Sequence, residues 1–335
     1  MANTNLNSDI ITDKSLEILH QKLNFVTNII TDYDDSFAKE GAKIGNTLRI
    51  RQPIQYGTGT GATMATGTGA DTTQSQTTLT ISTQRHVPMR FTSEELTMDI
   101  DRFAERHIEP AMSKLAAMIE NDALSMINEV GQMVSAGTKI EFSEIMDARA
   151  KLSNSVAPLN DRCALLDPQG NVDLVDALKG LFQDSSSISK QYKEGLMGRT
   201  AGFDFYENTL LPSHTSGAEG GLANYDIVGT GQVGSATNLT SSTINIDTGT
   251  KTVLKGDVIT IANVNAVHPE TKVSQGAGKQ FTVISPATAS GTTTITVSPA
   301  LIASGPYQNV DAAPANNAAI TVAGAASTAY KQSLL

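Results

Sequence analysis

Cysteine and histidine are the side chains best able to act as nucleophiles, bases or metal ligands, and this chain has few of them. Cys163 is its single cysteine, which excludes an internal disulfide and a zinc site built from cysteines. It stands in the apolar run 163–166, where we expect a small buried side chain and not a nucleophile. The five histidines form no H-x-x-x-H or other ligand pair: His20, His86, His107, His214 and His268. We therefore expect no metal site.

Two glycine-rich stretches have the composition of phosphate-binding loops. Residues 229–234 fit the pattern G-x-G-x-x-G and follow a strand-like segment, Tyr225–Val228. A dinucleotide site also needs a helix directly after the glycines, so that its N-terminus faces the pyrophosphate. Residues 235–242 have the composition of a loop instead, and the stretch 57–69 lacks the Lys-Ser/Thr of a phosphate loop. Both are predicted to be flexible segments, and no cofactor is expected.

The remaining candidates for a metal site or an active site are clustered carboxylates. The acidic cluster at 32–35 lacks the twelve-residue calcium-loop pattern and is predicted to be a solvated turn. Glu94 and Glu95 follow Thr92 as a capping box, where acidic side chains complement the helix dipole. No nucleophile, base and stabilising group come together in a known pattern. The chain is therefore predicted not to be an enzyme.

Composition narrows the class of protein further. A length of 335 residues suits two or three domains, and an apolar content of 39% allows a substantial core. The net charge of −10 argues against general nucleic-acid binding, which requires a basic surface. The N-terminus does not have the pattern of a signal peptide, and no apolar run is long enough to cross a membrane. We expect synthesis in the cytoplasm and no membrane partner.

Three elements are predicted in the first 138 residues, and one of them would contact a neighbouring molecule. Ser15 can cap a helix whose apolar positions have helical spacing: Leu16, Leu19, Leu23 and Val26. Alternation at 48–51 and again at 79–82, around a glycine-rich stretch, predicts a long β-hairpin with a polar face. A hairpin alone is marginally stable, so it should lie on a neighbouring molecule. Apolar positions from Met112 to Val130 predict one long helix that begins near Pro110 and ends at Gly131.

The second half of the chain changes from α/β to β composition. Helices are predicted at 145–152 and 172–182, and strands at 164–166 and 201–206, with Pro168 in the turn after the first strand. From about 216 onward, short strands recur between turn signals and indicate a small β-barrel or sandwich. The six strand candidates are Tyr225–Val228, Thr243–Ile246, Val258–Ile261, Phe281–Ile284, Thr294–Val297 and Ile320–Val322.

Two groups of motifs resemble a known family. Thr200-Ala201-Gly202-Phe203-Asp204-Phe205 is followed by Leu210-Leu211-Pro212. The second group comprises Leu254–Ala262, Gln280–Ile284 and Thr294–Pro299. In these motifs and in the order of its parts, the chain resembles the major capsid (coat) proteins of short-tailed double-stranded-DNA phages that carry an inserted domain. Those proteins have the Hong Kong 97 type of capsid fold.

The resemblance implies an α+β, tailed-phage capsid fold that is divided into six parts. They are an N-terminal arm (1–50), an extended β-hairpin or E-loop (51–91), a peripheral domain with the spine helix (92–138), a central (axial) α/β domain (139–224), an inserted β-barrel domain (225–325), and a return to the central domain (326–335). The last part looks too short to complete that domain, which leads us to expect a truncated or unusual ending.

The resemblance also implies a function and partners. Copies of the chain would assemble as hexamers and pentamers of an icosahedral capsid in the virion, together with a scaffolding protein and a portal protein. Packaged DNA would be bound only weakly and without sequence preference. The expected subunit-interface residues are Arg49, Arg51, Met64, Arg85, Arg90, Glu94 and Glu95. The alternative, a surface-layer or adhesin-like β-rich binding protein, fits the Thr/Gly/Ser-rich half but not the long helix.

Overall fold

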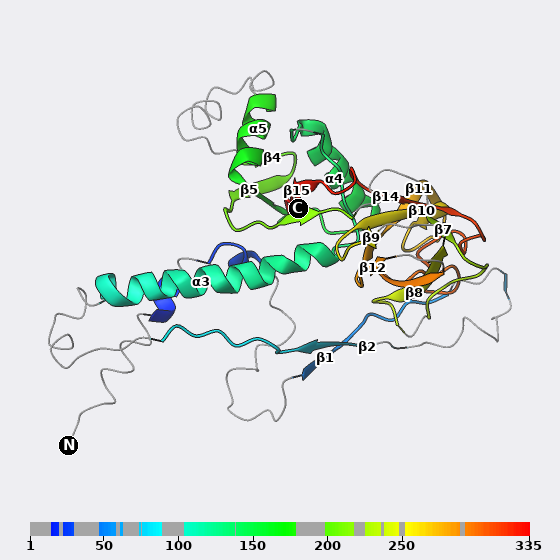
Figure 1. Ribbon diagram of the computed structural model, residues 1–335, viewed down its shortest axis with the longest axis horizontal. Helices are drawn as coiled ribbons and strands as arrows, with labels where there is room; N and C mark the ends of the chain where they lie inside the picture. The colour runs from blue at the N-terminus through cyan, green and yellow to red at the C-terminus, as the bar shows by residue number, and fades with distance from the viewer. Residues whose placement is uncertain are drawn as a thin grey trace. The chain divides into compact units, whose positions relative to one another are not determined.

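The computed structural model describes residues that group into two compact units (Figure 1). Described are residues 15–19, 23–29, 47–57, 61–62, 74, 76–88, 104–137, 139–178, 198–217, 225–235, 238–247, 252–288 and 292–335. The first unit takes its described residues from 1–48, 78–125 and 208–212, and the second takes them from 49–77, 126–207 and 213–335. Each unit therefore joins segments that are far apart in the sequence.

The first unit is built on the long helix α3, Glu109–Leu124 (Figure 1). A π-helical turn, η3 (Ala104–Ile108), precedes it, and a 3-10 segment, η4 (Ser125–Glu129), follows it. Pro110 lies in the first turn, as predicted, where its missing N–H leaves no intrahelical bond unmade. The buried side chains recur at every fourth position and form one stripe: Met112, Ala116, Glu120 and Leu124.

The C-terminal end of this helix differs from the prediction. α-Helical geometry stops at Leu124, where the Ser125 hydroxyl donates to the Asp122 carbonyl at 2.7 Å and the chain tightens into η4. The tighter twist turns the Met126 side chain outward, and half of it is exposed. Gly131 is not a left-handed cap either. A Cβ atom there would lie 2.9 Å from Pro299 Cδ, so close packing explains this glycine.

The N-terminal helix also presents a different face from the one expected. Residues 15–19 are helical, and η1 (Val26–Asn28) is a 3-10 turn; residues 20–22 of the predicted helix lie outside the described residues. Ser15 is already helical, so it is not the cap. Ile18 packs against Ile108 and Met112, while Leu16 is half exposed. The partner surface, and not the spacing of the leucines, decides which side is buried.

The predicted hairpin strands are present and paired. β1 (Thr47–Arg51) and β2 (Gln76–Thr80) form a two-stranded sheet. In β1 the two arginines are exposed, and Leu48 and Ile50, which alternate with them, are half-buried, as the alternation predicted. β2 begins and ends earlier than expected, and Ile81 lies beyond it with an exposed side chain. The predicted tip at 57–78 lies mostly outside the described residues.

The second unit contains a small α/β layer. Its elements are α4 (Phe142–Asn154), β3 (Cys163–Leu166), α5 (Pro168–Leu178), β4 (Arg199–Thr200) and β5 (Phe203–Glu207). The sheet has the order β3-β5-β4, with β3 and β5 parallel and β4 and β5 antiparallel. Its core consists of Ile145, Ala164, Leu166, Leu174, Leu178 and Phe203. Pro168 is the first residue of α5 and not part of a preceding turn, which suits its fixed φ.

The same unit contains a closed six-stranded antiparallel barrel. Its strands are β7 (Tyr225–Ile227), β8 (Ser242–Asp247), β10 (Val258–Val267), β11 (Ser274–Val283), β13 (Thr293–Ser298) and β14 (Ala319–Val322). Around the barrel they follow the order β10-β11-β13-β8-β7-β14. The short strands β9 (Thr252–Val253) and β12 (Ala287–Thr288) pair separately. All six strand candidates coincide with barrel strands, and the expected mixture of helices, strands and a barrel is confirmed.

The strands β10 and β11 are far longer than the sequence indicated. They continue outward as a hairpin with a turn at 268–273. The outer half of β11, residues 274–279, is glycine, alanine and polar residues, most of them exposed. Because this half of β11 has no buried side, its sequence shows no apolar alternation. Only its backbone hydrogen bonds to β10 make it a strand.

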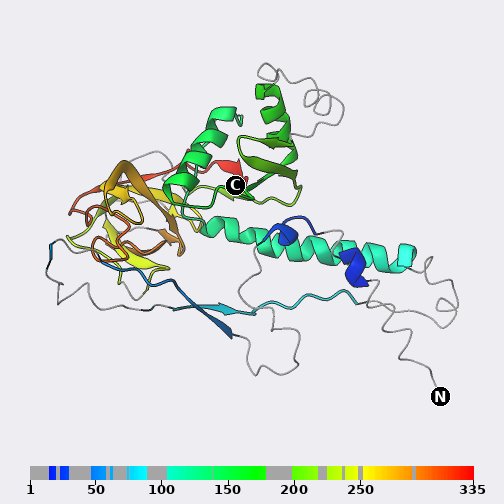
Figure 2. The same ribbon diagram turned by 180° about the vertical axis from the view of Figure 1, so that it is seen from behind.

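The C-terminal residues return to the α/β layer of the second unit (Figure 2). β15 (Ala329–Lys331) pairs with β6 (Ser213–Thr215), the strand that leads toward the barrel. The Leu334 and Leu165 backbones then exchange two hydrogen bonds, at 2.7 and 3.0 Å. The entry into the barrel and the exit from it therefore lie side by side.

Candidate assembly surface

A buried carboxylate on α3 ties together three distant segments of the first unit. Glu120 is only 4% exposed. Its Oε1 accepts the backbone N–H groups of Asn24 and of Phe25, the latter at 2.7 Å, and its Oε2 accepts Asn208 Nδ2 at 3.0 Å. A buried charge is tolerated when hydrogen bonds of this kind replace water. Glu120 thus holds the arm near residue 24 and the segment at 208 against the spine helix.

Sequence reasoning missed Glu120 because it followed apolar residues only. The available signal was its position, four residues after Ala116 and four before Leu124, on the stripe that is buried. Asn208 is buried too, and its Oδ1 accepts the Leu210 N–H at 2.8 Å. The segment that ends in Leu210-Leu211-Pro212 is therefore fixed by an asparagine that the motif did not include.

Arg85, one of the expected interface residues, has an acidic partner in its own unit. Its Nε and Nη2 donate to the two Asp122 carboxylate oxygens at 2.7 and 2.9 Å. This hydrogen bonding raises the pKa of the Arg85 guanidinium and lowers the pKa of the Asp122 carboxyl. The pair is solvent-exposed, so it fixes geometry more than it adds stability.

The other expected interface residues are only partly described. Arg49 and Arg51 project from the exposed side of β1, and neither is paired with an acidic side chain among the described residues. Met64, Arg90, Glu94 and Glu95 lie outside the described residues. Among the described residues, the structure thus places Arg49 and Arg51 next to each other on one side of β1, and Arg85 has its partner in Asp122.

The motif around Asp257 builds the junction between β6 and the barrel. His214 Nε2 lies 2.9 Å from Asp257 Oδ1, and the buried carboxylate also accepts the Leu254 N–H at 2.7 Å and the Gly217 N–H. Gly256 has a φ of +95°, which allows the tight turn that aims Asp257 inward. The motif thus fastens the entry strand to the start of β10.

Further contacts within the second unit join the barrel to the chain that follows α3. Thr282 Oγ1 donates to the Val130 carbonyl at 2.5 Å, and Gln280 Oε1 accepts the Met133 N–H at 2.9 Å. Lys255 Nζ lies 2.7 Å from Glu129 Oε1, with both side chains well exposed. The residues of the barrel that contact the segment after α3 therefore lie at 255 and 280–282, and not in the outer part of the β10–β11 hairpin.

Among the described residues, the cysteine, the histidines and the clustered carboxylates form no reactive centre. Burial, aided by Asp204 and Asp161, raises the pKa of the half-buried Cys163 thiol and makes it a poor nucleophile. The described residues contain no group of three His, Cys, Asp or Glu side chains placed to hold a metal ion. Residues 229–235 form a loop without a helix, as predicted. None of the described helices is long and apolar enough to cross a bilayer.

A family match gives the class of protein to which this architecture belongs, that of bacteriophage coat proteins. The family model described as "P22 coat protein - gene protein 5" matches residues 1–331. The chain therefore belongs to the P22 coat protein family. It is a structural, capsid-forming protein of the virion and not a member of an enzyme family, and nothing supports the adhesin-like alternative. None of the curated proteins compared with the chain matches it.

Several solved structures are also similar to parts or most of the chain. The CUS-3 coat protein I-domain is 34% identical over 31% of this chain and 97% of its own, with a TM-score of 0.23. A Mycobacterium phage Che8 structure is 9% identical over 91% and 89% of the two chains, with a TM-score of 0.40. The mature capsid of bacteriophage PhiM1 is 12% identical over 88% and 90%, with a TM-score of 0.35. These scores are low, and the assignment rests on the family match.

Proposed function

We propose that copies of this chain form the hexamers and pentamers of an icosahedral shell around double-stranded DNA, with the hairpin at 51–91 lying on a neighbouring subunit. The observation that carries the proposal is the exposure of large apolar side chains along the hairpin. Tyr56 is 71% exposed, Leu79 59% and Ile81 58%. Leu79 lies in β2, Ile81 directly follows it, and Tyr56 lies five residues after β1. Exposed apolar groups on and next to the strands of a marginal two-stranded sheet favour a protein–protein contact, because burying them stabilises the assembly.

Charged hairpin residues would set the register of this contact. We assign the subunit interface to Arg49, Arg51, Met64, Arg85, Arg90, Glu94 and Glu95. Arg49 and Arg51 support the assignment because both are exposed on one side of β1. Arg85 would act differently, since its bond to Asp122 fixes the chain after β2 to α3. Charge pairs at an interface chiefly determine which partner and which register are accepted.

The six parts expected from the sequence would each have a place in such a shell. The barrel at 225–325 would be an insertion, which is supported by the pairing of the entry strand β6 with the exit strand β15. The arm at 1–50 would be held to the peripheral domain (92–138) through Glu120. Residues 326–335 would rejoin the central domain at 139–224, which the Leu165–Leu334 bonds support.

The remaining partners follow from the same role. A scaffolding protein and a portal protein would join the assembly in the cytoplasm of the host bacterium. Packaged DNA would be held weakly, since a chain of net charge −10 lacks the cationic excess that phosphate binding requires. Strong, salt-dependent binding of DNA to the purified subunit would contradict this part of the proposal.

Negative-stain electron microscopy of the chain expressed with and without its phage's scaffolding protein tests the assembly. We expect closed shells of uniform size in the presence of the scaffolding protein. Arg49→Glu combined with Arg51→Glu should leave small oligomers, whereas Lys139→Glu, an exposed lysine outside the hairpin, should still assemble. Small oligomers of the unaltered chain under both conditions would overturn the proposal.

A further inference from the structure

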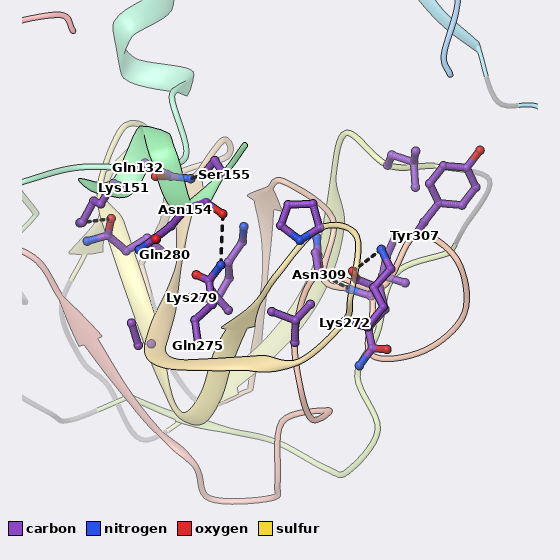
Figure 3. A pocket seen from close by; sticks show the side chains of 18 of the residues that line it. Gln132, Lys151, Asn154, Ser155, Lys272, Gln275, Lys279, Gln280, Tyr307 and Asn309 are labelled. Carbon is purple, nitrogen blue, oxygen red and sulfur yellow. Dashed lines mark hydrogen bonds between the residues drawn. The ribbon is translucent and has the colours of Figure 1, made fainter. Parts of the chain in front are cut away.

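A cavity of about 400 Å³ opens in the second unit where the β10–β11 hairpin meets the end of α4 and the loop around residue 307 (Figure 3). This volume is typical of small-molecule sites, which lie in the range of about 300–1,000 Å³. The cavity is lined by residues from several elements, so it is not a groove along one strand. Its lining includes Gln280, which also binds the Met133 N–H, and Gln55 from the segment that follows β1.

Three lysines and no acidic residue line this cavity. Figure 3 shows Lys151 on one side beside Gln280, Lys272 on the other side near Tyr307 and Asn309, and Lys279 between them. Most of the other polar lining groups are amide side chains, which can donate hydrogen bonds. The cavity lining is therefore basic, although the chain has a net charge of −10.

None of the three lysines forms an ion pair with a carboxylate among the described residues. Lys151 donates to the Met133 carbonyl and to Gln280 Oε1, the latter at 2.9 Å. Lys272 donates to Gln55 Oε1 and to the Gln308 carbonyl, both at 3.3 Å. Lys279 has no hydrogen-bonding partner among the residues that the structure describes. These acceptors are all uncharged, and each ammonium group has three donors.

Burial makes the charged form of each lysine costly. Desolvation lowers the pKa of Lys151, Lys272 and Lys279. Asp147 and Glu270 partly oppose this for Lys151 and Lys272, but neither lines the cavity, and no carboxylate opposes it for Lys279. A bound anion would supply the missing countercharge.

The C-terminus of α4 is the alternative reason for lysines at this place. A helix end carries about half a negative charge and attracts cations. Here, however, Gln275 Nε2 donates to the Asn154 carbonyl at 3.1 Å, and Gln132 Nε2 donates to Ser155 Oγ at 2.8 Å. The backbone N–H groups of Ser155, Val156 and Ala157 bond three more carbonyls of the last turn, so no lysine is needed to satisfy the helix end. About half a charge also does not balance three cations.

We propose that this cavity binds a small anion with at least two phosphate groups, either an inorganic polyphosphate or the phosphate chain of a nucleotide. Lysines on opposite sides of the cavity suit an anion with separated charges, and lysine is a common phosphate ligand. The amide nitrogens of Gln132 and Gln275 each have a second N–H, beside the one bound to Ser155 or Asn154, that can bind a further phosphate oxygen. Binding would stabilise the junction between the barrel hairpin and α4, because a ligand stabilises the state that binds it.

Calorimetric titration of the purified full-length chain with sodium tripolyphosphate tests this inference. We expect saturable binding of one anion per chain at neutral pH, with affinity falling as salt rises. Affinity should also fall as the pH rises through the lowered pKa of the lysines, because the anion binds their protonated form. Adenosine triphosphate in a second titration separates the sources: equal affinity indicates the phosphate chain alone, and tighter binding indicates that the nucleoside is also held.

Lys279→Met removes one cation with little change in side-chain size, and Lys331→Met is its matched control on an exposed strand outside the cavity. Lys279→Met should weaken tripolyphosphate binding by about tenfold or more, while Lys331→Met should change it by less than about twofold. The thermal unfolding midpoint of Lys279→Met should be unchanged or higher, so loss of binding cannot be ascribed to misfolding. No binding to the unaltered chain, or equal weakening by both substitutions, would overturn the inference.

Discussion

Glu120 shows how a single side chain can organise a unit built from distant segments. Both of its carboxylate oxygens accept N–H donors: Oε1 from the backbone of Asn24 and Phe25, and Oε2 from the Asn208 amide. A glutamine of the same shape has only one acceptor oxygen, so its NH₂ group must face a donor on one side or the other. The site therefore selects a carboxylate through its hydrogen bonding.

Glu120→Gln should lower the free energy of unfolding by about 1–3 kcal/mol, because one buried donor loses its acceptor. Adding Asn208→Asp supplies an acceptor for the new NH₂ group, and its second oxygen can still accept the Leu210 N–H. The double variant should therefore be more stable than Glu120→Gln alone. Urea unfolding measures both changes, and Glu270→Gln, on an exposed turn, should shift stability by less than about 0.5 kcal/mol.

Hydrogen exchange of backbone amides is a second test of the role of Glu120. The amides of Asn24 and Phe25 should exchange faster in Glu120→Gln than in the unaltered chain, because their acceptor is weakened. Equal stability of the single and double variants, together with unchanged exchange at these amides, would show that Glu120 does not hold the arm.

The entry into the barrel depends on close backbone packing between elements. Gly217 follows β6, and its N–H donates to the Asp257 carboxylate at 3.1 and 3.2 Å. A Cβ atom at this position would lie 2.2 Å from the Thr252 carbonyl oxygen and 2.8 Å from Asp257 Oδ2. The first neighbour is backbone, and the second belongs to a buried carboxylate held by the Leu254 N–H, so the backbone of the junction would have to move.

Gly217→Ala should therefore destabilise the second unit by about 2 kcal/mol or more, in the upper range for overpacking. Gly137→Ala is the matched control, because a Cβ there meets nothing within 4 Å and the residue has no left-handed φ. Thermal unfolding followed by circular dichroism compares the two variants. Equal midpoints would mean that the junction is loose and that the His214–Asp257 contact does not fix the barrel.

Elements with an alternating or helical apolar face could be predicted, and those without one could not. The six barrel strands and α4 each bury one side, so apolar residues recur along that side and the pattern can be seen in the sequence. The outer part of the β10–β11 hairpin is stabilised by backbone pairing, which requires no particular residue types and so produces no sequence pattern. The 3-10 turn η4 was missed because Met126 and Val130 continue the apolar spacing although the twist changes.

The candidate surfaces were predictable only as far as they lie on local elements. Arg49 and Arg51 were assigned to one exposed side of a strand because alternation is a local property. Glu120 and Asn208, 88 positions apart, pair through tertiary packing that no spacing rule contains. The three cavity lysines come from α4, the hairpin turn and β11, so they too become neighbours only in the folded chain.

At the scale of the whole molecule, the residues that stabilise the folded subunit differ from those that would join subunits. The cores and the junction at Asp257 stabilise the subunit by itself. Leu79 and Ile81, at and just beyond the end of β2, contribute little to that stability because most of each side chain is exposed. Substitutions there should separate assembly from folding.

Leu79→Ser combined with Ile81→Ser should leave the free energy of unfolding of the subunit within about 0.5 kcal/mol of the unaltered chain. The same variant should lose most of its closed shells, because the apolar contact with the neighbouring subunit is removed. Val172→Ser, on the exposed side of α5, removes a similarly exposed side chain (60%) outside the hairpin and should assemble normally. Sedimentation velocity and electron microscopy measure shell yield. Full assembly of the hairpin variant would show that exposed apolar groups on the hairpin are not what joins the subunits.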